Sequence, residues 1–222
     1  MTNRPTNRPT DQLIDLLSSN VKPVAPLAPP LARAGVTLAV MILMSGVAFA
    51  LLRESNPLQS REAADAGLIG LEMLAMLATG ILAVTAAFFL SVPGRSRNWL
   101  GAPLVPFGAW LLLSGTGCFR DMLRTSSAGW QLGHSADCLM FIVVFSLLLG
   151  APLVWRLSRA APIDPLPVAA LGGLGTAALA AFLLHFFHPF AVTFIDLAFH
   201  VAAITIVIAL AALFKRPMLR PA

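Results

Sequence analysis

Six long runs of apolar residues divide the chain, and short polar or proline-containing connections separate them. Each run approaches the roughly 20 residues that an α-helix needs to cross the hydrocarbon core of a bilayer. Pro103 and Pro106 weaken the third run near its start, because proline removes backbone hydrogen bonds. The pattern predicts an all-α integral membrane protein whose six transmembrane helices form a bundle over residues 34–214. The runs are Ala34–Leu52, Leu68–Val92, Trp99–Gly117, Cys138–Trp155, Leu166–Phe187 and Phe190–Phe214.

The composition supports a membrane protein over a soluble one. Of the 222 residues, 58% are hydrophobic and 11% are charged, whereas an ordinary soluble domain has about 25% charged residues. The formal net charge is +5, but the 15 Lys and Arg residues stand singly or in pairs and form no basic stripe for a phosphate backbone. We therefore expect a lipid bilayer and a protein as partners, and no direct contact with nucleic acid.

The basic residues predict the orientation of the spans, because cytoplasmic connections are enriched in Lys and Arg. An N-terminus in the cytoplasm leaves only Arg53, Arg61, Arg120 and Arg124 in outer connections. Trp99 and Trp155 then fall at the inner ends of their spans, where interfacial tryptophans are common. Both termini are expected in the cytoplasm, and residues 215–222 form a basic cytoplasmic tail. The inner residues are Arg4, Arg8, Lys22, Arg33, Arg95, Arg97, Arg156, Arg159, Lys215, Arg216 and Arg220.

Residues 1–33 form the predicted N-terminal cytoplasmic segment. The tandem repeat of Asn3–Thr10 contains no apolar residue to bury and is expected to be disordered. Thr10 is predicted to cap a short amphipathic helix, and the proline-rich linker Val21–Pro30 follows it. A partner protein or the inner leaflet of the membrane could cover the apolar face of this helix. That face consists of Leu13, Ile14, Leu16 and Leu17.

The predicted topology brings the polar residues of the spans to the outer side of the membrane. Polar groups are costly in lipid, so they are candidates for function. Asp196 and His200 lie four residues apart and therefore on one helix face. Hydrogen bonds between helices would explain both residues equally well, and phenylalanines around His185 favour a core histidine there. The intramembrane candidates are Glu72, His185, Asp196 and His200.

Cys118 and Cys138 are predicted at the outer ends of spans three and four, which would form an antiparallel hairpin. The two thiols could meet across the loop in a structural disulfide. They could also form a redox or thiol-reactive sensor, with Arg120 and Arg124 as basic neighbours. A third interpretation is transient soft-metal binding, without any resident cofactor. The ligand set for the metal would be Cys118, Cys138, His134 and His188.

Enzyme motifs do not support a catalytic function. The sequence contains no C-x-x-C, H-E-x-x-H, G-x-S-x-G or P-loop pattern. The residues alone leave open a small six-span transporter that uses the intramembrane polar groups. They also leave open a periplasm-facing thiol oxidoreductase, although the missing C-x-x-C counts against it. We therefore expect a protein that is not an enzyme.

Several strings resemble those of a known family. They are Asp11–Leu17, the Ser-Val-Pro-Gly-Arg-Ser-Arg string of Ser91–Arg97, Gly117–Asp121, Cys138, and the Phe-His-Pro-Phe string of Phe187–Phe190. In their order, and in chain length and number of spans, the chain resembles the NrsF family of bacterial inner-membrane proteins. Members of that family are negative regulators of extracytoplasmic-function sigma factors. The resemblance covers nearly the whole chain.

The resemblance implies a multi-pass protein of the bacterial inner membrane that holds a sigma factor at the inner leaflet. It further implies release of the sigma factor when metal or oxidative stress acts on Cys118 and Cys138. Sigma-factor binding would then fall to the N-terminal cytoplasmic segment. The partner-binding residues would be Asp11, Leu13, Ile14, Asp15, Leu16 and Leu17.

Overall fold

The computed structural model describes residues 8–19, 26–52, 66–124, 132–187 and 194–213. The elements among these residues are all helices and include no strand, which confirms the all-α part of the predicted fold class. Six of the helices are long and apolar enough to cross a membrane. The elements are α1 (Arg8–Ser19), α2 (Pro30–Leu52), α3 (Ala66–Leu90), the 3-10 helix η4 (Arg97–Leu100), α4 (Leu104–Arg124), α5 (Leu132–Ser158), α6 (Pro165–Leu184) and α7 (Phe194–Leu213).

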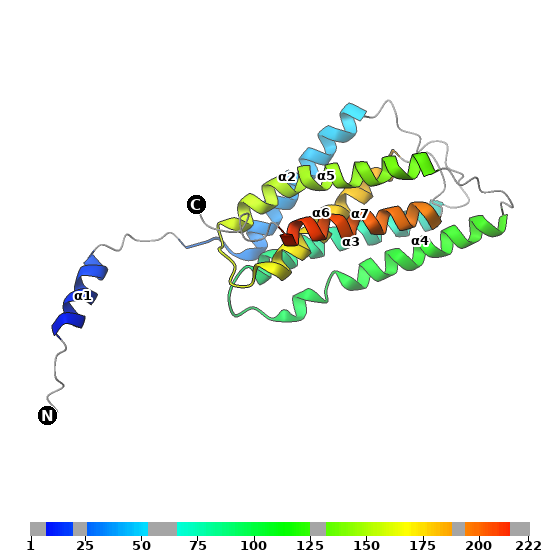
Figure 1. Ribbon diagram of the computed structural model, residues 1–222. Helices are drawn as coiled ribbons and strands as arrows, with labels where there is room; N and C mark the ends of the chain where they lie inside the picture. The colour runs from blue at the N-terminus through cyan, green and yellow to red at the C-terminus, as the bar shows by residue number, and fades with distance from the viewer. Residues whose placement is uncertain (1–7, 20–25, 53–65, 125–131, 188–193, 214–222) are drawn as a thin grey trace.

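Helix α6 occupies the middle of the bundle (Figure 1). It packs against α3, α5 and α7, whereas α2 lies outside against α3 and α5. In the most apolar 18-residue stretch of each helix, 78% of α6 and 11% of α2 is buried inside the bundle. A helix that is apolar on all sides can be buried by other helices or by lipid. The bundle uses α6 as its core and leaves most of α2 exposed.

Small residues allow α3 and α6 to approach closely. A Cβ atom added to Gly175 would lie 2.8 Å from Cγ2 of Val84 and 3.3 Å from the carbonyl oxygen of Gly80. The neighbouring small residues Gly172, Thr176 and Ala180 are also buried within the bundle. Packing of this kind is typical of membrane helices, since small side chains let two backbones come together.

Two helices begin earlier than the sequence pattern predicted. Helix α2 begins at Pro30, so residues 30–33 belong to the same helix as the first predicted apolar run. Proline suits this position because the first helical residues need no intrahelical N–H bond. Helix α1 begins at Arg8, so the predicted cap at Thr10 is wrong. The part of the repeat that the structure describes, residues 8–10, is helical and not disordered.

The third predicted span consists of two elements. Trp99 lies in η4, and α4 begins after Pro103 and extends to Arg124. Pro106 lies in the first turn of α4, where its missing N–H costs no intrahelical bond. Helix α5 begins at Leu132, so Cys138 lies inside that helix and not at its start. Both helices that carry the cysteines are therefore longer at their predicted outer ends than expected.

The predicted hairpin of spans three and four is wrong. Among the described residues, α4 packs mainly against α3 and α7, while α5 packs against α6, α7 and α2. Helix α7 thus lies between α4 and α5 (Figure 1). The short connection between two long helices favours neighbours, but the last helix of the chain packs into the space between them.

Candidate functional site

Helix α1 presents an uncovered apolar face. Its four large apolar side chains are each more than half exposed, and the helix lies apart from the bundle in Figure 1. At 100° per residue, Leu13 and Leu17 share one side of the helix, and Asp11 and Asp15 lie on the other. Asp11 lies in the first turn, where the helix dipole favours a negative charge. The helix is amphipathic, as predicted, and its apolar side is available to a partner.

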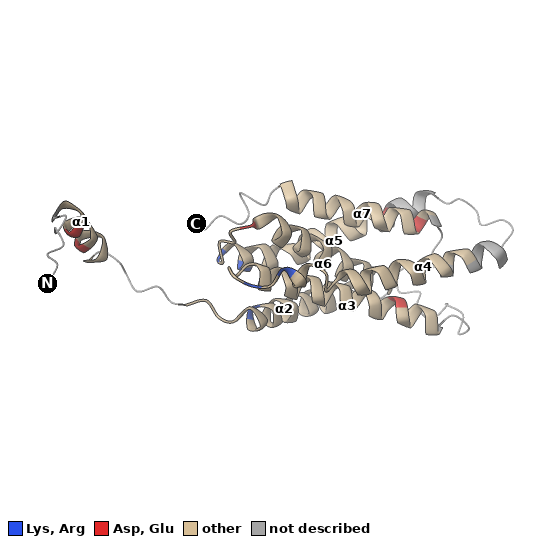
Figure 2. Cartoon of the chain, turned by 90° about the horizontal axis from the view of Figure 1, so that it is seen from below, with Lys and Arg blue, Asp and Glu red and all other residues tan. Residues whose placement is uncertain are grey.

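The described charged residues of the bundle lie near its two ends, and one acidic residue, Asp164, lies at the same end as the arginines because it pairs with Arg97. Figure 2 shows the described arginines at the end that faces α1, whereas the acidic side chains of α3 and α7 lie toward the opposite end. These acidic residues are Glu72 and Asp196. We call the first end the basic end and the second the acidic end. Of the arginines predicted on the outer side, Arg53 and Arg61 lie outside the described residues, as do the side chains of Arg120 and Arg124. The basic end carries Arg33, Arg95, Arg97, Arg156 and Arg159.

Aromatic rings accompany the arginines at the basic end. The guanidinium of Arg159 lies 3.9 Å from the ring centroid of Trp155. Trp99 stacks on Phe89 with ring centroids 4.2 Å apart, and Arg95 lies over Phe89. Rings of this type collect at membrane interfaces because they present both apolar and polar parts. Both tryptophans therefore lie at the same end of the bundle as the described arginines.

Arg33 joins two helices at the basic end. Its side chain is buried, and its Nη2 atom donates a hydrogen bond of 2.8 Å to the carbonyl oxygen of Arg156. That carbonyl belongs to the last turn of α5, where no intrahelical donor is available. The guanidinium also lies 5.0 Å from the ring centroid of Phe88. Sequence reasoning used Arg33 only as a charge, although an arginine at the start of an apolar run was the available signal.

The Ser-Val-Pro-Gly-Arg string ends α3. Ser91 is buried, and its hydroxyl donates to the carbonyl oxygen of Phe88 at 2.7 Å. Gly94 has a φ of 78°, a left-handed conformation that glycine adopts without strain. A cavity of about 550 Å³ lies between this turn and the connection of α5 to α6. Arg97 and Asp164 form an exposed ion pair of 3.7 Å at its rim.

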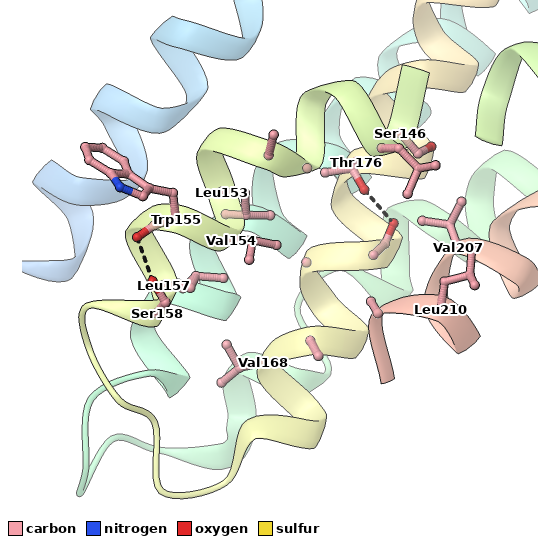
Figure 3. A pocket seen from close by; sticks show the side chains of 17 residues that line it. Ser146, Leu153, Val154, Trp155, Leu157, Ser158, Val168, Thr176, Val207 and Leu210 are labelled. Carbon is pink, nitrogen blue, oxygen red and sulfur yellow. Dashed lines mark hydrogen bonds between the residues drawn. The ribbon is translucent and has the colours of Figure 1, made fainter. Parts of the chain in front are cut away.

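An apolar groove of about 660 Å³ runs between α5, α6 and α7 (Figure 3). The hydroxyl of Thr176 donates to the carbonyl oxygen of Gly173, and that of Ser158 donates to the carbonyl oxygen of Trp155. These polar side chains therefore satisfy their own helices. A catalytic pocket needs polar groups that converge on a ligand, and the residues lining this groove do not supply them.

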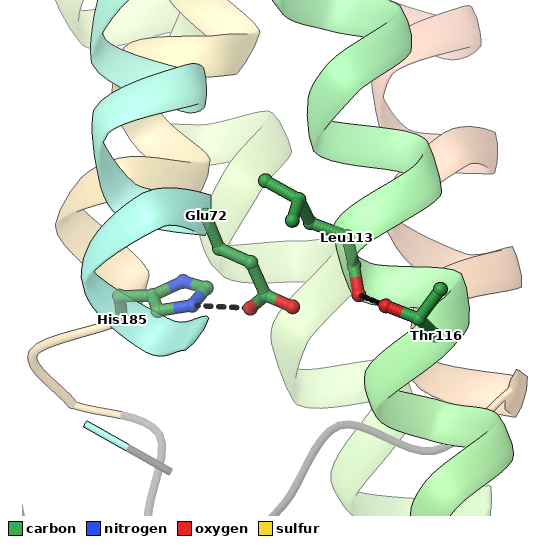
Figure 4. A network of polar contacts seen from close by, with 4 residues as sticks. All are labelled: Glu72, Leu113, Thr116 and His185. Atoms are coloured by element: carbon green, nitrogen blue, oxygen red, sulfur yellow. Dashed lines mark hydrogen bonds and ion pairs between the residues drawn. The ribbon is translucent and has the colours of Figure 1, made fainter. Parts of the chain in front are cut away.

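At the acidic end, Glu72 of α3 and His185 at the end of α6 form a buried pair (Figure 4). The distance from Nε2 of His185 to Oε2 of Glu72 is 3.6 Å, and both side chains are at most 7% exposed. Leu113 and Thr116 of α4 lie beside the carboxylate in Figure 4. The pairing links the two helices that form the closest contact in the bundle. It also places His185 in the core, where its aromatic surroundings suggested it would lie.

A second polar group forms around α7. His200 donates from Nδ1 to the backbone oxygen of Asp196 at 2.7 Å, which confirms that the two residues share a helix face. Both side chains are buried. Cys138 lies in the same buried cluster as Trp110 of α4 and Ile204 of α7, and the ring of Trp110 lies 6.5 Å from that of His200. The fold therefore brings Cys138 together with residues of α4 and α7.

Cys118 and Cys138 are both buried thiols and are not joined in a disulfide. The disulfide interpretation therefore does not hold in this structure. The exposed fractions are 2% for Cys118 and 4% for Cys138. Buried cysteines are ordinarily inert toward thiol reagents. A reagent must therefore enter the bundle, or the acidic end must open, before either sulfur reacts.

The described side chains provide no group of three or more His, Cys, Asp or Glu residues placed to hold a metal ion. The side chain of His134 and the whole of His188 lie outside this part of the chain. The proposed soft-metal ligand set therefore stays a prediction.

These features define the class: a helical bundle with six candidate membrane spans, one basic end and an amphipathic helix outside the bundle. Comparison with known families gives the particular group. The model of the NrsF family, described as negative regulator of sigma F, matches residues 17–220. The chain belongs to this family, as its sequence strings indicated. The match begins at Leu17, so most of α1 precedes it. No curated protein and no solved structure matches the chain.

Proposed function

We propose that this protein is a multi-pass inner-membrane anti-sigma factor that holds an extracytoplasmic-function sigma factor through α1. Family membership supplies the class of partner, a sigma factor. The observation that carries the proposal is the exposed face of Leu13, Ile14, Leu16 and Leu17 outside the bundle. An amphipathic helix of 12 residues is marginal by itself in water. Docking against a partner protein would stabilise it and cover its apolar side.

The division of charge supports an orientation with both termini in the cytoplasm. Arginines accumulate on the cytoplasmic side of membrane proteins, and the described arginines gather at the end that faces α1 (Figure 2). Two acidic residues on α1 make adhesion to the negatively charged inner leaflet less favourable. In the proposed orientation, Cys118, Cys138 and the Glu72–His185 pair would face the periplasmic side.

We further propose that a change at the periplasmic cysteines reaches α1 through α5 and α2. Cys138 lies near the start of α5, and Arg156 lies in its last turn. Arg33 of α2 is bonded to that last turn, and α2 follows the linker that carries α1. A shift of α5 would therefore move the helix from which the docking segment extends. This route replaces the predicted hairpin of spans three and four.

Co-purification of the sigma factor from membranes of the native cells tests the docking role. The variant Leu13→Ser/Ile14→Ser/Leu16→Ser/Leu17→Ser should retain at least about 100-fold less sigma factor, since each buried apolar side chain contributes about 1.5–3 kcal/mol. The matched control Gln12→Ala/Ser19→Ala alters the polar side of the same helix and should retain the sigma factor fully. Equal capture by both variants would exclude α1 as the docking helix.

Cysteine variants test the sensor role separately. In cells exposed to cadmium or to an oxidant, Cys118→Ser/Cys138→Ser should keep the sigma factor on the membrane while the wild type releases it. The control Ser114→Ala changes another buried small side chain of α4 and should release normally. Normal release by the double cysteine variant would remove the sensor role without affecting the docking result.

A further inference from the structure

The buried guanidinium of Arg33 is only partly satisfied by the protein. Nη2 donates to the last turn of α5, but Nη1 has no hydrogen-bond partner within the part of the chain that the structure describes. The side chain is 7% exposed, so bulk water does not solvate it well. A buried charged donor without an acceptor is costly. This atom therefore indicates a missing acceptor at the junction of α2 and α5.

Two further arginines lie at the same junction. Arg156 is half-buried and Arg159 is exposed, and their guanidinium carbons lie 5.9 Å and 3.9 Å from the ring centroid of Trp155. Among the described residues, Asp164 pairs with Arg97 and Glu72 pairs with His185. None of the three arginines at the junction forms an ion pair with a described carboxylate. The junction therefore concentrates positive charge that no carboxylate of the described residues balances in an ion pair. Guanidinium groups bind phosphate well because their donors match its oxygens.

The surface that continues from this junction along α2 and α5 is apolar. Both helices leave large side chains exposed along their length, and these would face the acyl chains of a bilayer. A ligand that fits both features has an anionic head and apolar chains. The exposed apolar residues are Val36, Leu43, Val47, Leu147 and Leu148.

We propose that the junction of α2 and α5 is a binding site for an anionic phospholipid of the inner leaflet. Its phosphate would be held by Arg156 and Arg159 at the surface, beside the buried charge of Arg33, and its acyl chains would lie along the exposed faces of the two helices. The proposal rests on the membrane orientation proposed above. An acidic protein segment would satisfy the guanidinium groups, but it would not cover the apolar surface beside them.

Native mass spectrometry of the full-length protein in detergent tests the site, with phosphatidylglycerol or phosphatidylcholine added as the probe. Phosphatidylglycerol should bind more tightly than phosphatidylcholine. Arg156→Gln and Arg159→Gln should each weaken its binding about fivefold to tenfold, since one arginine near a membrane surface contributes about a factor of five. Arg33→Gln should also weaken it, because the variant loses the buried positive charge beside the phosphate. The matched control Arg97→Gln removes an exposed arginine of the same end and should leave lipid binding unchanged.

Arg33→Gln also removes the hydrogen bond to α5 and could misfold for that reason. In that case the result for Arg159→Gln, which changes an exposed side chain, tests the site. Equal binding of the two lipids, or full binding by Arg159→Gln and Arg156→Gln, would overturn the site. Displacement of the lipid by millimolar inorganic phosphate would identify a site for free anions and would also overturn the lipid assignment. Sigma-factor capture from native membranes is measured in parallel for the same variants. Equal binding of the two lipids together with normal capture would contradict the lipid site and leave the docking role of α1 intact.

Discussion

Substitution of Gly175 by alanine tests the closest helix contact of the bundle. The added methyl carbon would lie 2.8 Å from Cγ2 of Val84, 3.1 Å from the backbone nitrogen of Val84 and 3.3 Å from the carbonyl oxygen of Gly80. Two of these three atoms belong to the backbone of α3, so a change of side-chain rotamer cannot relieve the contact. Helices α3 and α6 must therefore move apart.

The expected cost follows from two opposing terms. Overpacking of a well-packed core destabilises a protein by about 1–3 kcal/mol. Replacing a helical glycine by alanine favours the helix by up to about 1 kcal/mol. A methyl group added at Gly108 of α4 would meet no atom within 4 Å, so Gly108→Ala carries only the favourable term. The free energy of unfolding of Gly175→Ala should therefore lie about 1–3 kcal/mol below that of Gly108→Ala.

Thermal unfolding in detergent, followed by the loss of helical circular dichroism, measures the difference. A change of 1 kcal/mol corresponds to about 2–4 °C in Tm for a protein of this size. Gly175→Ala should unfold at a lower temperature than both the wild type and Gly108→Ala. A Gly175→Ala protein as stable as Gly108→Ala would show that α3 and α6 are not in contact at this position, and the central place of α6 would have to be revised.

Two further predictions concern the acidic end. His185→Leu removes the ring nitrogen that faces the buried Glu72 carboxylate and should lower the free energy of unfolding by about 3–5 kcal/mol; Glu72→Gln/His185→Leu should recover most of that loss, and additive losses in thermal unfolding would argue against the pair. Cys118 and Cys138 should react with a maleimide on the order of tenfold or more slowly in the folded protein than after denaturation, because both thiols are buried. Rapid labelling of either cysteine in folded protein would contradict its burial.

The sequence was sufficient for those features that depend on local composition and length. A run of about 20 apolar residues predicts a span whichever helices pack beside it, so all six long helices could be located from the sequence. The amphipathic pattern of α1 is also a local property. So is the position of each charged residue along its apolar run, which predicted that Arg95 and Arg156 lie at the other end of the bundle from Glu72 and Asp196. The strings at Ser91–Arg97 and around Cys138 likewise indicated the family that the comparison identified.

Only the tertiary structure determined which helices are neighbours. Lipid-facing and protein-facing apolar residues are chemically alike, so hydropathy does not specify that α7 lies between α4 and α5. That arrangement keeps Cys118 and Cys138 on helices that do not pack as a hairpin, and it buries Cys138 in one cluster with Ile204 and Val207 of α7. The contacts of Arg33 with Arg156, and of Glu72 with His185, likewise join residues more than 100 positions apart. Such pairings depend on how the helices pack, because no local pattern in the chain encodes the partner.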